Sequence, residues 1–155
     1  MLEFLVMNKL IIFDFNRTLY NPQTGALFPE VLSCLNSLNQ MATLGIITTT
    51  SPGRDRNLFR RLGILPYFRF IKIIKQKNIS NFRFICSEFN SSPENSYIVG
   101  DRLDEEIAFG NQLGFKTIWL CHSKNQLTDK YCPRYTIRSL SELSDIIERE
   151  DSDCN

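Results

Sequence analysis

Two aspartates in this sequence each follow directly after a short apolar run. Asp14 follows residues 10–13, Asp101 follows residues 97–100, and the hydroxyl-rich segment 48–50 ends a third such run. Carboxylate oxygens suit Mg²⁺, which usually also contacts a phosphate, and hydroxyls suit phosphate oxygens. A carboxylate can also attack phosphorus and form an acyl-phosphate. These residue types indicate phosphoryl transfer, which depends mainly on positioning and charge neutralisation.

The elements that must position these residues can be predicted from the alternation of apolar runs and helical patterns. The run before Asp14 is short and rich in Ile and Phe, which is typical of a strand buried on both faces. Clear strands are predicted over residues 10–13, 44–49, 97–99 and 116–120, and weaker ones over 68–74 and 135–137. Helices are predicted over residues 29–41, 55–62, 80–89, 104–113 and 139–148.

This alternation of strands and helices predicts an α/β fold, a Rossmann-like three-layer α/β/α sandwich with a mostly parallel five-stranded sheet. The carboxyl ends of parallel strands meet at one edge of the sheet, where open α/β sheets bind ligands. We therefore expect Asp14, Asp101 and Thr48 to lie close together. Residues 20–28 contain turn formers between apolar pairs and predict a small hairpin.

The length of 155 residues predicts one domain, which we place at residues 1–149. Residues 1–8 are interpreted as an N-terminal extension, because Met7 is a plausible natural start. The polar, acidic residues 150–155 are expected to form a disordered tail.

Composition excludes several classes of protein. A net charge of +1 argues against nucleic acid or a membrane surface as a partner, and no uncharged apolar run is long enough to span a membrane. Five scattered cysteines without a C-x-x-C pair favour free thiols in the cytoplasm rather than disulfides or zinc. The basic residues Arg54, Arg56, Arg60 and Arg61 are expected on a solvated helix face, with contact to an anionic substrate as the alternative.

Four segments, taken in order, resemble the motifs of the haloacid dehalogenase (HAD) superfamily of phosphohydrolases. The first motif, D-x-D-x-T, is matched by residues 14–18, and the second, a strand ending in Thr or Ser, by 44–49. The third is a lysine at the head of a helix, where Lys77 fits best and Lys75 is a close rival. The fourth, G-D with a second acid a turn later, is matched by residues 100–106.

The resemblance implies a role for each matched position. Asp14 would attack phosphorus, and Mg²⁺ would be held by Asp14, the backbone carbonyl of Asn16, and Asp101. Thr48 and Lys77 would hold the phosphoryl oxygens, and the neighbouring Thr49 is included with them. Glu106, with Glu105 as a second candidate, would orient metal-bound water. Each of these side chains also has a plain structural interpretation, as a turn former, strand end, surface lysine or first-turn acid.

One departure from the family pattern bears on activity. The family's phosphatases have a second aspartate in the first motif, which protonates the leaving group and then activates water; Asn16 stands there in this sequence. An asparagine cannot exchange a proton at neutral pH, and the loss of a general acid/base typically costs about 10²–10⁴-fold in rate. Dehalogenases, phosphonate hydrolases and ion-pumping ATPases of the family also differ at this position.

The segments between Thr18 and Thr48 and between Thr48 and Lys77 are too short for the cap domain that many family members carry. Capless members act on large substrates or close the site with a neighbouring subunit. The expected partners are therefore a phosphorylated substrate, macromolecular or covered by a second subunit, and a second copy of the chain.

Two functions follow from these residues. The first is a Mg²⁺-dependent phosphohydrolase or phosphotransferase that acts through an aspartyl-phosphate on Asp14, slowed by Asn16. The second is a catalytically weakened relative that binds a phosphate ligand or a protein partner. Dehalogenase or phosphonate chemistry is weaker, because those members build their pockets with a cap or a Schiff-base lysine.

Overall fold

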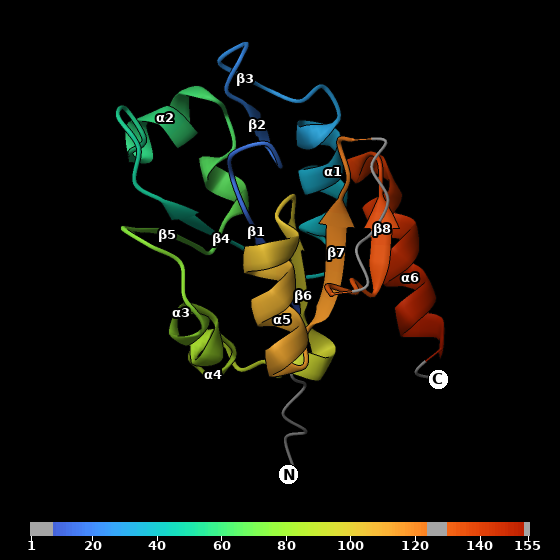
Figure 1. The fold of residues 1–155 in the computed structure, drawn as a ribbon. Helices are drawn as coiled ribbons and strands as arrows, with labels where there is room; N and C mark the ends of the chain where they lie inside the picture. The colour runs from blue at the N-terminus through green and yellow to red at the C-terminus, as the bar shows by residue number, and fades with distance from the viewer. Residues whose placement is uncertain (1–7, 124–129, 154–155) are drawn as a thin grey trace, which may run out of the picture.

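The computed structural model describes residues 8–123 and 130–153 as a three-layer α/β/α sandwich around one central sheet (Figure 1). The sheet has the strand order β5-β4-β1-β6-β7-β8, and every neighbouring pair is parallel. Its strands are β1 (Leu10–Phe13), β4 (Thr43–Thr49), β5 (Phe70–Ile74), β6 (Tyr97–Gly100), β7 (Lys116–Leu120) and β8 (Tyr135–Ile137). A separate hairpin pairs β2 (Tyr20–Asn21) with β3 (Ala26–Leu27), as predicted.

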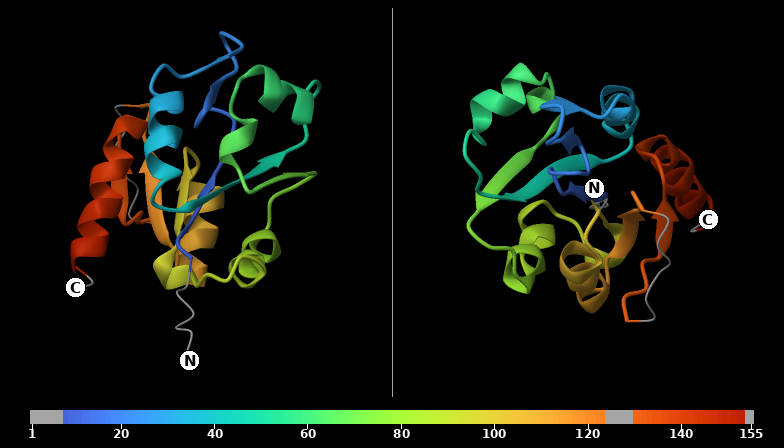
Figure 2. Two further views of the ribbon diagram at one scale, coloured as in Figure 1. Left: turned by 180° about the vertical axis from the view of Figure 1, so that it is seen from behind. Right: turned by 45° about the horizontal axis from the view of Figure 1, so that its top comes forward.

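Helices cover both faces of the sheet, as the two turned views show (Figure 2). One face carries α1 (Val31–Leu38), α2 (Arg56–Arg61) and α6 (Leu143–Asp153). The opposite face carries α3 (Ile79–Arg83), α4 (Ile85–Glu88) and α5 (Ala108–Leu113). Short helical turns complete the described elements, at Leu65–Tyr67, Pro93–Asn95, Leu103–Ile107 and Leu140–Glu142.

Strand β1 lies in the middle of the sheet, and all four of its residues are buried. Successive strand residues point to opposite faces, so Ile11 and Phe13 pack into the core on the α1 and α6 side. Leu10 and Ile12 pack into the core on the α3 and α5 side. This double burial explains the continuous apolar run, and it leaves Asp14 as the first polar residue beyond it.

The sheet has six strands rather than the five predicted, because both of the weaker strand ranges join it. Residues Phe70–Ile74 pair with β4, and residues Tyr135–Ile137 pair with β7. The first is an edge strand of half-buried residues, and the second is only three residues long. Edge strands are packed less completely than central ones, so their sequences carry a weaker apolar signal.

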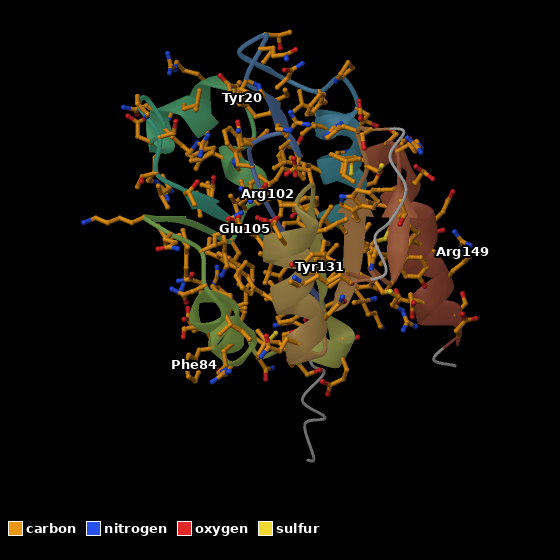
Figure 3. All side chains as sticks on the ribbon, viewed as in Figure 1. Tyr20, Phe84, Arg102, Glu105, Tyr131 and Arg149 are labelled. Carbon is orange, nitrogen blue, oxygen red and sulfur yellow. The ribbon has the colours of Figure 1, made fainter. Side chains whose placement is uncertain are left out.

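The helix predicted over residues 80–89 is two short helices, α3 and α4, which meet at Phe84. Phe84 has φ −97° and ψ −5°, in the bridge region where a helix is interrupted. Its ring projects into solvent, 62% exposed, while Phe82 and Ile85 face the core (Figure 3).

The prediction of a disordered tail from residue 150 is wrong for residues 150–153, which continue helix α6. Glu150 is buried and makes contacts that hold the end of the helix against the sheet. Its Oε1 accepts hydrogen bonds from Arg134 Nε at 2.8 Å and from the Tyr135 hydroxyl, and its Oε2 lies 3.5 Å from Lys116 Nζ. Residues 154–155, and residues 1–7 of the proposed extension, lie outside the described part of the chain.

Across residues 8–123 and 130–153, no helix combines the length and the apolar character that crossing a membrane requires.

Replacing Glu150 with Gln should lower the free energy of unfolding by about 1–3 kcal/mol at pH 7, because Arg134 and Lys116 would face a neutral amide in place of a carboxylate. The hydrogen bond from Arg134 lowers the pKa of Glu150 to about 2, whereas a free glutamate titrates near 4.3. A carboxylate with a depressed pKa stabilises the fold above its unfolded pKa and stops doing so as the pH falls. The difference in unfolding free energy between the native chain and Glu150→Gln should therefore shrink as the pH falls from about 5 to about 2, as measured by urea unfolding.

The matched control is Glu148→Gln, which changes an exposed glutamate of the same helix. This variant should unfold like the native chain. Equal losses in both variants, or a deficit for Glu150→Gln that does not change with pH, would contradict the assigned role of Glu150.

Candidate active site

Asp14 stands where β1 leaves the sheet, and its backbone fixes it there. Its N–H donates to the Val99 carbonyl of β6 at 3.0 Å, so the pairing with β6 extends one residue past the strand. The side chain is buried, with 7% of its residue surface exposed. Just after it the chain turns sharply, because the Phe15 carbonyl accepts hydrogen bonds from the N–H groups of both Leu19 and Tyr20. The turn carries the β2–β3 hairpin above this edge of the sheet (Figure 1).

Arg17 occupies the tightest point of that turn with φ +61°, in the left-handed region. A side chain there costs roughly 1 kcal/mol, which is why glycine or asparagine is usual. Its Nε donates to Asp101 Oδ2 at 3.0 Å, so the strained residue forms an ion pair with the aspartate that follows β6.

Strand β4 brings Thr48 and Thr49 to the same edge. Thr48 is buried, and its Oγ1 accepts a hydrogen bond from Arg54 Nη1 at 3.2 Å. The same Nη1 donates to the Thr49 carbonyl at 2.6 Å, and the guanidinium lies 5.4 Å from the centre of the Phe15 ring. Arg54 therefore folds back from the loop before α2 and lies against the end of β4.

Of the two candidate lysines, Lys77 is buried at this edge of the sheet and Lys75 is exposed. The Lys77 ammonium lies between two buried carboxylates, 2.6 Å from Asp14 Oδ1 and in direct contact with Glu106 Oε1. It immediately precedes Asn78, whose side chain accepts a hydrogen bond from the Asn81 N–H and caps α3. Lys77 therefore stands at the head of a helix, as the sequence predicted.

Glu106 reaches the site through a local irregularity. Residues Leu103–Ile107 form a π-helical turn, in which the Ile107 N–H bonds to the Arg102 carbonyl five residues back. Such wide turns occur most often at functional sites. The Glu106 side chain also passes so close to the backbone that a Cβ at Gly100 would lie 2.9 Å from its Oε2. A side chain at position 100 would therefore displace the Glu106 carboxylate from this position.

The three carboxylates of Asp14, Asp101 and Glu106 have oxygen atoms within 4.8 Å of one another. Burial and the negative charge of Asp14 raise the pKa of Asp101 to about 6, against the opposing effect of Arg17. The same two causes raise the pKa of Glu106 to about 7, against the opposing effect of Lys77. Burial lowers the pKa of Lys77, but attraction to Asp14 and Glu106 outweighs it and leaves that pKa raised.

This carboxylate cluster fits a divalent cation. Glu106 Oε2 is buried and has no hydrogen-bond partner among the residues that the structure describes, and an unpaired buried carboxylate oxygen is costly. Hard cations such as Mg²⁺ take oxygen ligands of this kind and usually retain several waters. A bound cation would offset the repulsion that raises the pKa values of Asp101 and Glu106.

The predicted residues fall into two groups. One group lies together at the carboxyl edge of the sheet and consists of Asp14, Thr48, Lys77, Asp101 and Glu106. Thr49 lies next to this group, and its carbonyl accepts the hydrogen bond from Arg54. Glu105 lies apart from the carboxylate cluster: it pairs with Arg102 at 3.5 Å on the outer side of the turn, where both are labelled in Figure 3.

Asn16 lies beside the site rather than in the carboxylate cluster. It is half-buried and lines a pocket of about 380 Å³ together with Tyr20 and Arg54. Sequence reasoning placed Arg54 on a solvated helix face, whereas it lies before α2 and contacts Thr48. The sequence signal for this contact was the Pro52-Gly53 turn after the threonines, because a tight turn can return the next side chain to the end of the strand.

Comparison with known proteins agrees with this geometry. Residues 78–143 match the family model described as HAD-hydrolase-like. The chain is 31% identical to the glyceraldehyde 3-phosphate phosphatase of Pyrococcus furiosus over 114 residues, 68% of this chain and 48% of that protein. It is 25% identical over 126 residues to the pyrimidine 5′-nucleotidase YjjG of Escherichia coli, 77% of this chain and 56% of that protein. The chain thus spans about half the length of the curated relatives it matches.

Solved structures show the same fold. The 2-haloacid dehalogenase from Pseudomonas syringae superposes with a TM-score of 0.78 at 19% identity, over 93% of this chain and all of that one. The magnesium-bound HAD-hydrolase YfnB from Bacillus subtilis superposes with a TM-score of 0.72 at 24% identity, over 79% of this chain and 57% of that one.

A parallel sheet with carboxylates, threonine and lysine gathered at its carboxyl edge defines a HAD-type α/β fold. The chain belongs to the haloacid dehalogenase superfamily.

Replacing Lys77 with Met should lower the free energy of unfolding by about 3–5 kcal/mol in metal-free buffer at pH 7.5, because two buried carboxylates lose their counter-charge. Lys75→Met, which removes an exposed lysine two residues earlier, should change it by less than about 0.5 kcal/mol. Urea unfolding followed by circular dichroism measures both. A loss for Lys75→Met as large as that for Lys77→Met would refute the buried ion-pair assignment.

Proposed function

We propose that this protein is a Mg²⁺-dependent phosphohydrolase or phosphotransferase that acts through an aspartyl-phosphate on Asp14. The observation that carries the proposal is the placement of the Asp14 carboxylate. It is buried, held by the Lys77 ammonium at 2.6 Å, and grouped with two further carboxylates. The names of the relatives support a phosphate ester as the substrate.

The residues that would hold Mg²⁺ are Asp14, Asp101 and the backbone carbonyl of Asn16, with Glu106 orienting water. Bound there, the cation would neutralise charge on the phosphoryl oxygens. Thr48 and Lys77 would contact those oxygens, with Thr49 beside them. Glu105 is not needed for this role, because its carboxylate faces Arg102.

In the proposed first step a carboxylate oxygen of Asp14 bonds to phosphorus, and the bond from phosphorus to the ester oxygen breaks. The electron pair of that bond leaves with the alcohol oxygen. In the second step water attacks the acyl-phosphate, releasing inorganic phosphate and restoring the carboxylate. Another alcohol in place of water would complete a phosphotransfer. Asn16 can donate a hydrogen bond to the leaving oxygen but cannot give it a proton, so esters of acidic alcohols should react fastest.

The chain is proposed to act as one domain without a cap. The segment between β1 and β4 contains only the β2–β3 hairpin and α1, and the segment between β4 and Lys77 contains only α2, a short helical turn and β5. The substrate would then be macromolecular, or the site would be covered by a second copy of the chain. A cytoplasmic location belongs to the same proposal, on the cysteine pattern of the sequence.

With p-nitrophenyl phosphate, an ester of an acidic alcohol, the native chain should release nitrophenol in the presence of Mg²⁺. The rate should fall to background in EDTA, because the carboxylate cluster loses its cation. It should also fall to background in Asp14→Asn, which keeps the shape of the side chain but not the nucleophile. Asp104→Asn, a change to an exposed aspartate, is the matched control and should retain full activity. Activity in Asp14→Asn equal to the native rate would overturn the aspartyl-phosphate mechanism.

The alternative function is a phosphate-binding or protein-binding relative with weakened catalysis, and Asn16 is the observation that favours it. Asn16→Asp should restore the proton donor and raise kcat on alkyl phosphates such as glyceraldehyde 3-phosphate by about 10²–10⁴-fold. The gain on p-nitrophenyl phosphate should be much smaller, because that leaving group needs no acid. Steady-state rates on both esters distinguish the two functions: brisk turnover of alkyl esters by the native chain would exclude the weakened relative.

A further inference from the structure

We propose that the substrate's leaving group carries a second anionic group, a carboxylate or a second phosphate, bound by Arg54 and Arg61 in the pocket beside Asn16. This inference rests on the proposed function, since it assigns the part of the substrate that is not transferred. The pocket, called here the arginine pocket, has a volume of about 380 Å³ and lies between the β2–β3 hairpin and α2. It is lined by Asn16, Tyr20, Pro22, residues 51–54, Leu58 and Arg61.

The position of the arginine pocket ties it to the leaving group. Asn16 lines the pocket, and this is the residue that stands where the family's leaving-group acid is expected. The pocket is not lined by Lys77 or by the carboxylates of Asp14, Asp101 and Glu106. A phosphate ester with its phosphorus at Asp14 would therefore direct its alcohol portion past Asn16 into the pocket. The volume is sufficient for a small organic acid.

The charge of the arginine pocket sets the chemistry of its occupant. Two arginines line it and no acidic residue does, although the whole chain is nearly balanced, with 18 basic and 17 acidic residues. Arg54 uses Nη1 on Thr48 and Thr49, which fixes the plane of its guanidinium. Arg61 is exposed, and no ion pair holds it within the described residues.

Guanidinium groups bind carboxylates and phosphates through paired N–H donors. Other groups around the pocket suit the polar remainder of a small acid. The Asn16 amide and the Tyr20 and Ser51 hydroxyls can donate to or accept from its oxygens. The Tyr20 ring is held in place by stacking on Phe15, with ring centres 4.9 Å apart. The fixed Tyr20 ring and the two arginines, Arg54 and Arg61, beside the reacting centre indicate a site selective for doubly anionic esters.

Matched pairs of esters test this directly. The esters 3-phosphoglycerate and glycerol 3-phosphate differ only in a carboxylate in place of a hydroxymethyl group, and 2-phosphoglycolate and 2-hydroxyethyl phosphate differ in the same way. The kcat/KM of the acid should exceed that of its neutral partner by about tenfold or more, in keeping with one charge-assisted contact. In Arg61→Gln this ratio should fall about tenfold, and Arg61→Lys should recover part of it. The matched control Arg60→Gln changes the neighbouring exposed arginine outside the pocket and should keep the native ratio.

Calorimetric titration of the same esters, with Mg²⁺ present, separates this inference from the proposed function. If p-nitrophenyl phosphate is hydrolysed in an Asp14-dependent manner but the acids are not preferred, or the preference is unchanged in Arg61→Gln, the arginine pocket proposal is wrong and the function stands. If no ester is hydrolysed but the acids bind more tightly in an Arg61-dependent manner, the pocket stands and the hydrolase proposal fails. If the esters are neither hydrolysed nor bound, both are overturned.

Discussion

The buried ammonium of Lys77 is the interaction on which the rest of the site depends. Asp14, Asp101 and Glu106 bring three negative charges to one buried point, and desolvated like charges repel strongly. Lys77 contacts two of these groups, and Arg17 pairs with the third. Lys77 and Arg17 offset part of this repulsion, and the remainder, together with burial, raises the pKa values of Asp101 and Glu106.

The scaffold around this cluster is shaped to bring side chains from distant parts of the sequence within contact. The continuous burial of β1 places Asp14 at the carboxyl edge, and its backbone bond to β6 holds it next to the segment that carries Asp101. The π-helical turn and Gly100 together admit Glu106. The π-helical turn is a local departure from regular structure, and it serves the position of one carboxylate. Functional sites are where such departures are most often found.

Much of the site could be predicted because its residues stand at strand ends. Asp14, Thr48 and Asp101 each follow an apolar run, and parallel topology alone brings them together. The contact of Arg17 could not be predicted, because it depends on a tight turn whose direction the sequence does not specify. The contact of Arg54 was indicated only by the Pro52-Gly53 turn, which does not fix where the side chain goes. The ordered residues after Glu148 were missed for a related reason. The acidic composition of residues 150–155 predicts a solvated segment. The contacts of Glu150 with Arg134, Tyr135 and Lys116, which order it, cannot be read from that composition.

The left-handed conformation of Arg17 has a consequence for efforts to stabilise this protein. A procedure that judges each residue by its backbone angles would choose glycine at position 17 and gain roughly 1 kcal/mol from relief of strain. It would at the same time remove the counter-ion of Asp101. Thermostability and charge balance therefore oppose each other at a single residue. Selection on backbone angles alone would therefore remove a side chain that compensates the carboxylate cluster.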